Sequence, residues 1–301
     1  MNAGFFWSLA SAFLWSTTFV CARYLLAGDM VDPITLSLLR FSVGGVLLLL
    51  LGIILYKKDI FAISLHDLLR VSFVALFGMV GMSVLLFFGQ KSASAINSSL
   101  IMQLSPVFIL FMGVFIGERI GAADVAGVGI SLIGTLMVVG VIGNYSGSAG
   151  SWYKGELLVL AAAFSWAIYS VVGKGIVCKI GGYKATTWAM LAGSVELLIL
   201  WLFLPAPVIY PKSHEGWIII AYLAIFPTAI AFFAWYEAMR TISLSLLNVM
   251  QYLTPAFTII LAMAFLHERM QWLQWIGMVL ILAGVMIIFF RREGLEKARS
   301  A

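Results

Sequence analysis

The stretch Leu9-Ala10-Ser11-Ala12-Phe13-Leu14-Trp15 is repeated in the second half of the chain as Leu160-Ala161-Ala162-Ala163-Phe164-Ser165-Trp166. Further matches follow in the same order at a nearly constant spacing of about 150 residues, which is the signature of an internal repeat. They are Ser105-Pro106-Val107-Phe108 with Thr254-Pro255-Ala256-Phe257, Glu118-Arg119 with Glu268-Arg269, and Gly127 and Gly134 with Gly277 and Gly284. The chain is therefore predicted to consist of two related halves, residues 1–145 and 146–301, that meet in the Gly- and Ser-rich stretch Gly143–Gly155.

The composition indicates a membrane protein. Of the 301 residues, 63% are hydrophobic and 10% are charged, whereas soluble proteins average about 45–50% and about 25%. Lys and Arg lie at the ends of apolar runs, so the net charge of +5 indicates membrane orientation and not a nucleic-acid partner. Cys21 and Cys178 have neither the spacing of a metal site nor the density of a disulfide framework.

Ten apolar segments are long enough to cross the hydrocarbon core, for which a helix needs about 20 residues. They are Phe5–Ala27, Pro33–Tyr56, Leu69–Phe88, Ala95–Ile116, Val125–Ile142, Leu157–Val177, Ala185–Leu204, Trp217–Tyr236, Leu244–Leu266 and Leu273–Phe290. The short connections leave no room for a domain outside the membrane. The first segment lacks the basic start and the short apolar core of a cleaved signal peptide.

Each half holds five of these segments, an odd number, so the second half is expected to cross the membrane in the opposite sense. Inverted repeats are common among secondary transporters, which bind their substrate near the membrane midplane between the repeats. With the N-terminus placed in the cytoplasm, most Lys and Arg side chains lie on the inner side, as the positive-inside rule requires. We therefore expect an all-α protein of the inner (plasma) membrane, with ten transmembrane helices and both termini cytoplasmic.

Four features recur in both halves. They are a tryptophan in the first helix, Ser/Thr-Pro-x-Phe in the fourth, Gly117-Glu118-Arg119 or His267-Glu268-Arg269 after it, and a glycine-spaced fifth helix. This pattern resembles the EamA family of the drug/metabolite transporter superfamily, over nearly the whole chain. The resemblance implies a ten-helix inner-membrane carrier that exports amino acids or related small metabolites. The motifs are specific for the fold and not for the substrate.

Pro106 and Pro255 stand at the same place in the fourth helix of each half. Each removes one backbone hydrogen bond and frees the carbonyl four residues earlier, on Met102 and Gln251. We interpret both prolines as hinges that shape a cavity, and a tolerated kink is the alternative.

Polar and aromatic side chains within the spans define the expected cavity. Ser245, Asn248, Gln251 and Tyr252 share one helix face that is too polar for lipid, although hydrogen bonding between helices is the alternative. Trp15 and Trp166 lie in mid-span, away from the interface where tryptophans gather, and core packing is their alternative. In the fourth helix, the sequence does not choose between two polar faces. The expected substrate-binding residues are Trp15, Thr18, Arg40, Asn97, Ser99, Gln103, Trp166, Tyr169, Asn248, Gln251 and Tyr252.

Arg40 and Glu196 are charges that lie away from any helix end, at matching depth below the outer surface. A charge inside the membrane costs about 2.5–3.5 kcal/mol on the insertion scale, so it needs a partner or water. Three arrangements are open: an Arg40–Glu196 pair, Arg40 bound to a substrate carboxylate, or separate partners for each. The small residues Gly127 and Gly134 indicate close helix packing, with a homodimer seam as the alternative.

The leading hypothesis for function is a secondary carrier that exports small metabolites, above all amino acids, by alternating access. An exporter of lipophilic cations or of a lipid-linked solute is the alternative, with Glu196 as its candidate carboxylate. A membrane-embedded enzyme is disfavoured because the ionisable residues do not cluster. The sequence contains no Walker loop, zinc helix or nucleophile elbow, so we expect no cofactor and no metal. The expected partners are the small-molecule substrate and the lipid bilayer.

Overall fold

The computed structural model describes residues 3–115, 121–142, 153–203, 208–239 and 250–300, and all regular structure in these ranges is helical. Nine of the helices in the described part are long and apolar enough to cross a membrane. A shorter apolar helix, Leu253–Phe265, lies within the ninth predicted segment. The prediction of an all-helical, multi-pass membrane protein is confirmed, whereas the first residues of the ninth segment, 244–249, lie outside the described residues.

Within the described residues, the helices cover the predicted spans with ends that differ by a few residues, except that α14 continues ten residues past the predicted end at Phe290. The first half contains α1 (Ala3–Ala27), α2 (Pro33–Tyr56), η1 (Lys57–Phe61), α3 (Leu65–Ala75), η2 (Leu76–Gly81), α4 (Met82–Gln90), α5 (Ala95–Met102), α6 (Ser105–Phe115) and α7 (Ala122–Val139). The second contains α8 (Lys154–Ile180), α9 (Gly182–Phe203), α10 (His214–Ala224), η3 (Ile225–Ile230), α11 (Ala231–Met239), α13 (Leu253–Phe265) and α14 (Trp272–Ser300). The start of α2 shows why the boundaries are readable: Asp32 accepts hydrogen bonds from the N–H groups of Ile34 and Thr35, and Pro33 is the first helical residue.

The fourth span is not the continuous helix that the sequence predicts from Ala95 to Ile116. Gln103 and Leu104 form a turn that separates α5 from α6. The physical reason is Pro106, which leaves the Met102 carbonyl without its helical donor, and the Ser105 hydroxyl donates to that carbonyl over 2.6 Å. The other half repeats the interruption, because Tyr252 is a turn residue directly before α13.

The third span of each half is interrupted in a different way. Within α3–η2–α4 and within α10–η3–α11, the central six residues form π-helix. Both segments occupy the same position in their halves, near the middle of their spans. A π segment inserts an extra residue into a helix and is frequent at functional sites.

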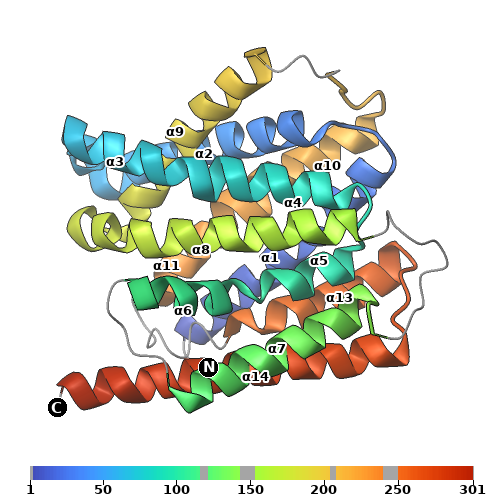
Figure 1. Ribbon diagram of the computed structural model, residues 1–301. Coiled ribbons are helices and arrows are strands. Elements are labelled where there is room, and N and C mark those ends of the chain that lie inside the picture. Colours follow the sequence, from blue (N-terminus) through green and yellow to red (C-terminus); the bar gives the residue numbers. More distant parts are fainter. Residues whose placement is uncertain (1–2, 116–120, 143–152, 204–207, 240–249, 301) are drawn as a thin grey trace.

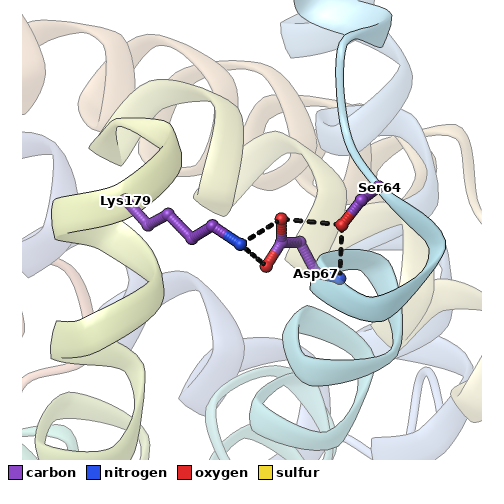
Figure 2. Close-up of polar contacts among 3 residues, drawn as sticks. All are labelled: Ser64, Asp67 and Lys179. Atoms are coloured by element: carbon purple, nitrogen blue, oxygen red, sulfur yellow. Dashed lines mark hydrogen bonds and ion pairs between the residues drawn. The ribbon is translucent and has the colours of Figure 1, made fainter.

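The helices run roughly along one direction, so the bundle has two ends (Figure 1). We call the end where α4 ends, on the right of Figure 1, the Lys91 end, because Lys91 directly follows α4 and pairs with Asp29 across 2.8 Å. The end on the left is the Lys179 end, where the Lys179 ammonium lies 2.7 and 2.8 Å from the two Asp67 carboxylate oxygens (Figure 2). One ion pair therefore links neighbouring segments at each end of the bundle.

The glycine-spaced fifth helices, α7 and α14, pack against each other (Figure 1). A Cβ atom placed on Gly127 would lie 2.6 Å from the Gly284 carbonyl oxygen, and one on Gly134 would lie 2.5 Å from that of Gly277. The lower number on α7 meets the higher number on α14, so the two helices are antiparallel. Close packing within the chain, the first of the two alternatives for this glycine stripe, is confirmed.

Candidate functional site

Four interruptions of helical geometry lie at matching positions in the two halves: η2 and η3, and the turn at Gln103 and Leu104 with the turn at Tyr252. They come from the third and fourth spans of both halves. The first three lie near the middle of their described spans. Interrupted helices at membrane depth are tolerated where they are buried in protein or line a cavity, because lipid offers no hydrogen bonds. The middle of the bundle is therefore the candidate site.

Hydroxyl groups satisfy backbone carbonyls in or beside both π segments. Ser165 on α8 donates to the Phe77 carbonyl of η2 over 2.8 Å. Thr228 of η3 donates to the carbonyl of Leu223, near the end of α10, also over 2.8 Å. The aromatic ring of Tyr169 lies directly against Gly78, which leaves no room for a side chain there. These contacts hold the two π segments in place and bring Tyr169, a predicted site residue, to one of them.

The two repeated tryptophans have different aromatic neighbours. Trp15 meets Phe232 and Trp235 of α11, with ring centroids 5.2 and 5.4 Å away. Trp166 stacks on Tyr169 of its own helix at 5.0 Å. Both indoles are partly exposed within the structure. The aromatic partners of Trp15 were not among the predicted site residues, because only the fold places α11 beside α1.

Three polar atoms around the ninth span are enclosed and have no hydrogen-bond partner among the described residues: Thr18 Oγ1, Gln251 Nε2 and Thr254 Oγ1. Thr18 and Gln251 were predicted to face the cavity, and they come from neighbouring parts of the bundle, since α1 packs on α13. Thr254 was missed, although its place before Pro255 in the repeated motif was a usable signal. Enclosed polar groups without partners are rare in proteins, and a bound solute or water would satisfy them.

Of the three arrangements open for Arg40 and Glu196, the pair is not formed. The Arg40 guanidinium donates from Nε to Thr228 Oγ1 over 2.7 Å, and Arg40 is 5% exposed. The Glu196 carboxylate instead accepts a hydrogen bond from Ser72 over 2.7 Å. Each charge therefore has its own partner, which leaves the substrate-carboxylate hypothesis for Arg40 open.

Asn97 lies at the Lys91 end and not at the middle. Its amide donates to Glu156 over 3.2 Å and accepts from Gln274 over 3.1 Å, so it joins α5, α8 and α14. Beside it, both carboxylate oxygens of Glu268 accept backbone N–H groups at the start of α5. A bridging role accounts for Asn97, and its assignment to the cavity stays a prediction.

The remaining predicted residues are distributed around the interruptions. The fully buried Ser99 hydroxyl donates to the Ile96 carbonyl of its own helix. Gln103, Pro106 and Tyr252 are partly exposed, and Pro255 is buried at the start of α13. Asn248 lies outside the described residues.

Near the Lys179 end, a hollow of about 520 Å³ is lined by Leu55, Tyr56, Phe233 and Glu237. It borders the last turn of α2 and the helix α11, whose Phe232 touches Trp15. In the described part of the chain, no group of three or more His, Cys, Asp or Glu side chains gathers as metal ligands would. The described site residues offer hydrogen bonding, aromatic contact and one buried guanidinium.

Known proteins share this architecture. The model of the EamA-like transporter family matches the chain twice, over residues 2–140 and 153–290. A protein of Streptantibioticus cattleyicolor named probable terminal-alkyne amino-acid exporter is 30% identical over 301 residues, which cover 98% of this chain and 96% of the relative. The aromatic amino acid exporter YddG of Ancylobacter novellus is 26% identical over 249 residues, 82% of this chain and 83% of the relative.

Two further comparisons concern the class of protein and the fold. An uncharacterized transporter of Archaeoglobus fulgidus is 27% identical over 274 residues, 90% of this chain and 92% of the relative. A solved crystal structure superposes with a TM-score of 0.68 over 97% of this chain and 98% of that chain. Its sequence is 24% identical, so the likeness concerns the fold alone.

Proposed function

The chain belongs to the EamA-like transporter family, and on that premise we propose that it exports small metabolites, amino acids first, as a secondary carrier. It is a transporter and not an enzyme. The names of two relatives, an amino-acid exporter and an aromatic amino acid exporter, support the substrate class. The site supports it chemically, because it combines aromatic surfaces with unpaired hydrogen-bonding groups and a buried guanidinium.

We propose alternating access between two inverted halves, residues 1–145 and 146–301. The antiparallel contact of α7 and α14 supports this arrangement, because Gly127 meets Gly284 while Gly134 meets Gly277. Such an exchange of partners is what a two-fold axis between equivalent helices produces. Inverted repeats allow one half to rock against the other around a central site.

The observation that carries the proposal is the matching set of interruptions in the third and fourth spans of both halves, three of which lie near the middle of their described spans. Discontinuous helices form the substrate sites of many transporters at the same depth. We propose that the cavity is lined from these segments and from α1 and α8, with Pro106 and Pro255 as hinges. Its proposed residues are Trp15, Thr18, Arg40, Ser99, Gln103, Trp166, Tyr169, Asn248, Gln251 and Tyr252.

We further propose that the protein resides in the inner (plasma) membrane with both termini cytoplasmic, so that the Lys179 end faces the cytoplasm. A homodimer would have to use a surface other than Gly127 and Gly134, because α14 covers both. The lipid bilayer is the surrounding partner, and many apolar side chains on the outside of the bundle are exposed to it, among them Phe203 and Phe265.

Flux into and out of proteoliposomes tests the proposal. Purified protein is reconstituted and loaded in turn with labelled amino acids and with a lipophilic cation, and protein-free liposomes serve as the baseline. We expect counterflow of at least one amino acid above the baseline. Cation flux without amino-acid flux would instead support the alternative of a cation exporter.

A further inference from the structure

Arg40 is a buried cation in the part of the bundle between the Lys91 end and the middle. It lies about two helical turns after Pro33, where α2 begins. The ion pairs recorded among the described residues join Lys91 to Asp29, Lys179 to Asp67 and Arg291 to Asp124, and none of them includes Arg40. The charge of Arg40 is therefore not neutralised by an acidic side chain in the described part of the chain.

The guanidinium is held along one edge. Its Nε donates to Thr228 Oγ1, and the Thr228 hydroxyl in turn donates to the Leu223 carbonyl. Gly44, one turn further along α2, touches the Thr228 side chain so closely that a Cβ atom would not fit. This close approach of α2 to η3 sets the position of Arg40. The edge formed by Nη1 and Nη2 carries no hydrogen bond to the described residues.

The surroundings of Arg40 suit an anion. The guanidinium carbon lies 5.2 Å from the Phe41 ring centre and 5.9 Å from that of Phe87. These rings are apolar and Arg40 is buried, so an arriving anion would interact with the guanidinium in a medium of low polarity. A guanidinium edge matches a carboxylate through two parallel hydrogen bonds.

The aromatic residues near Arg40 indicate what the rest of the ligand, beyond its carboxylate, would contact. Phe232 follows Thr228 by about one helical turn, towards the Lys179 end, and it contacts Trp15, which also contacts Trp235. A carboxylate at Arg40 would therefore have an aromatic surface within the length of one amino-acid side chain. The position in η2 that corresponds to Thr228 is Met79, so the first half lacks this arrangement.

We propose that Arg40, positioned by Thr228, binds the carboxylate of a monocarboxylate solute whose apolar side chain lies against Trp15 and Phe232. The inference rests on the proposed transport function and names its substrate class. It assigns one carboxylate site to the carrier, on the boundary between α2 and the π segment η3. Thr228 is a positioning residue, because it acts through the guanidinium.

The test measures ligand selectivity in purified protein. Quenching of indole fluorescence gives the affinities for L-phenylalanine, for L-phenylalaninamide, in which the carboxylate is replaced by a neutral amide, and for 3-phenylpropionate. For the wild type we expect the acid to bind about ten- to a hundredfold more tightly than the amide, the range of a hydrogen-bonded charge pair. Arg40→Leu should lose this preference by weakening the acids while changing the amide less than about twofold.

Two further variants separate positioning from charge. Arg40→Lys keeps the charge but loses the two-bond edge, so an intermediate preference is expected. Thr228→Val should weaken the acids and leave the amide unchanged. Arg70→Leu, at an exposed arginine of α3, is the matched control and should behave as the wild type.

The outcomes distinguish the inference from the proposed function. An acid preference that survives in a folded Arg40→Leu protein overturns the role of Arg40 and leaves amino-acid export standing. Binding of 3-phenylpropionate but not of phenylalanine supports the role of Arg40 as a carboxylate ligand and contradicts amino-acid export. If Arg40→Leu does not fold, a wild type that binds acid and amide equally overturns the inference, and a preference that Thr228→Val reduces supports it. Absence of binding by all three ligands contradicts both.

Discussion

Gly134 and Gly277 face each other across the α7–α14 contact, and a Cβ atom on either would lie within 2.5 or 2.6 Å of the carbonyl oxygen of the other. The contact needs glycine on both sides, since real Cβ atoms are not found at such distances. Between the two glycine pairs, Ser131 donates to the Ile281 carbonyl over 3.4 Å. The fifth helices of the two halves are thus joined backbone to backbone.

The first prediction concerns this contact. Gly134→Ala should separate α7 from α14 and lower the midpoint of thermal unfolding. Gly129→Ala is the control in the same helix, because no atom lies within 4 Å of a Cβ placed there. Alanine at an unconstrained helical position stabilises by about 0.5–1 kcal/mol relative to glycine, so this variant should melt at the same temperature or higher. Equal melting of the two variants would contradict close packing.

The Lys179–Asp67 pair gives a second prediction. Asp67 also accepts a hydrogen bond from Ser64, the residue that caps α3, so the carboxylate links the start of α3 to the end of α8 (Figure 2). Asp67→Asn and Lys179→Gln should each lower the melting temperature in detergent. Their effects should not add, because both remove the same interaction.

Lys174→Gln is the matched control for this pair, since Lys174 is exposed on the same helix about one turn earlier. It should leave the melting temperature unchanged in the wild type and in Asp67→Asn. Additive losses from Asp67→Asn and Lys179→Gln would show that the two side chains act independently.

The third prediction separates ligand binding from packing at Thr18. Its hydroxyl oxygen is enclosed without a partner among the described residues, so Thr18→Val removes an unsatisfied polar group while it keeps the shape. Such a replacement should be neutral or stabilising for the fold. If the hydroxyl contacts the solute, the apparent Km for amino-acid counterflow in proteoliposomes should rise while the melting temperature does not fall. A lower melting temperature with unchanged transport would point to a structural role instead.

The fourth prediction concerns the aromatic surface. Trp15→Ala removes the contacts with Phe232 and Trp235, and aromatic contacts contribute about 0.5–1.5 kcal/mol beyond area burial. We expect the affinity for phenylalanine to fall about threefold to tenfold, and the affinity for alanine to change less. Trp272→Ala, at a side chain that is 69% exposed, is the control. Equal losses for both amino acids would assign Trp15 to packing alone.

The hydrophobic pattern was sufficient to predict the spans, and the repeated glycines predicted close packing of the fifth helix of each half, because both signals are local in sequence. That α7 and α14 are each other's partners was not predicted, because the two helices are about 150 residues apart. The π segment η2 was not predictable, whereas η3 contains Pro227, a usable signal that was missed. A π segment differs from α-helix by one inserted residue, and Leu76–Gly81 contains no proline to mark it.

Long-range partners were likewise hidden in the sequence. Thr228 holds Arg40 from 188 residues away, and Asp67 meets Lys179 across 112 residues. Two charges at matching depth suggested an Arg40–Glu196 pair, but depth does not fix which helices are neighbours. The packing of α2 against η3 decided the partner of Arg40, and that packing depends on Gly44.

The last prediction concerns orientation, and the natural cysteines can report it. Cys178 is exposed near the Lys179 end, whereas Cys21 is only partly exposed in α1. With the Lys179 end in the cytoplasm, Cys178 in a Cys21→Ala background should react with an impermeant maleimide in inside-out vesicles and not in intact cells. A cysteine introduced at the exposed Lys212 of a protein without natural cysteines should give the reverse result, because residues 208–213 precede α10 at the Lys91 end. Labelling of Cys178 from outside intact cells would place the Lys179 end, and with it both termini, on the outer side and overturn the proposed orientation.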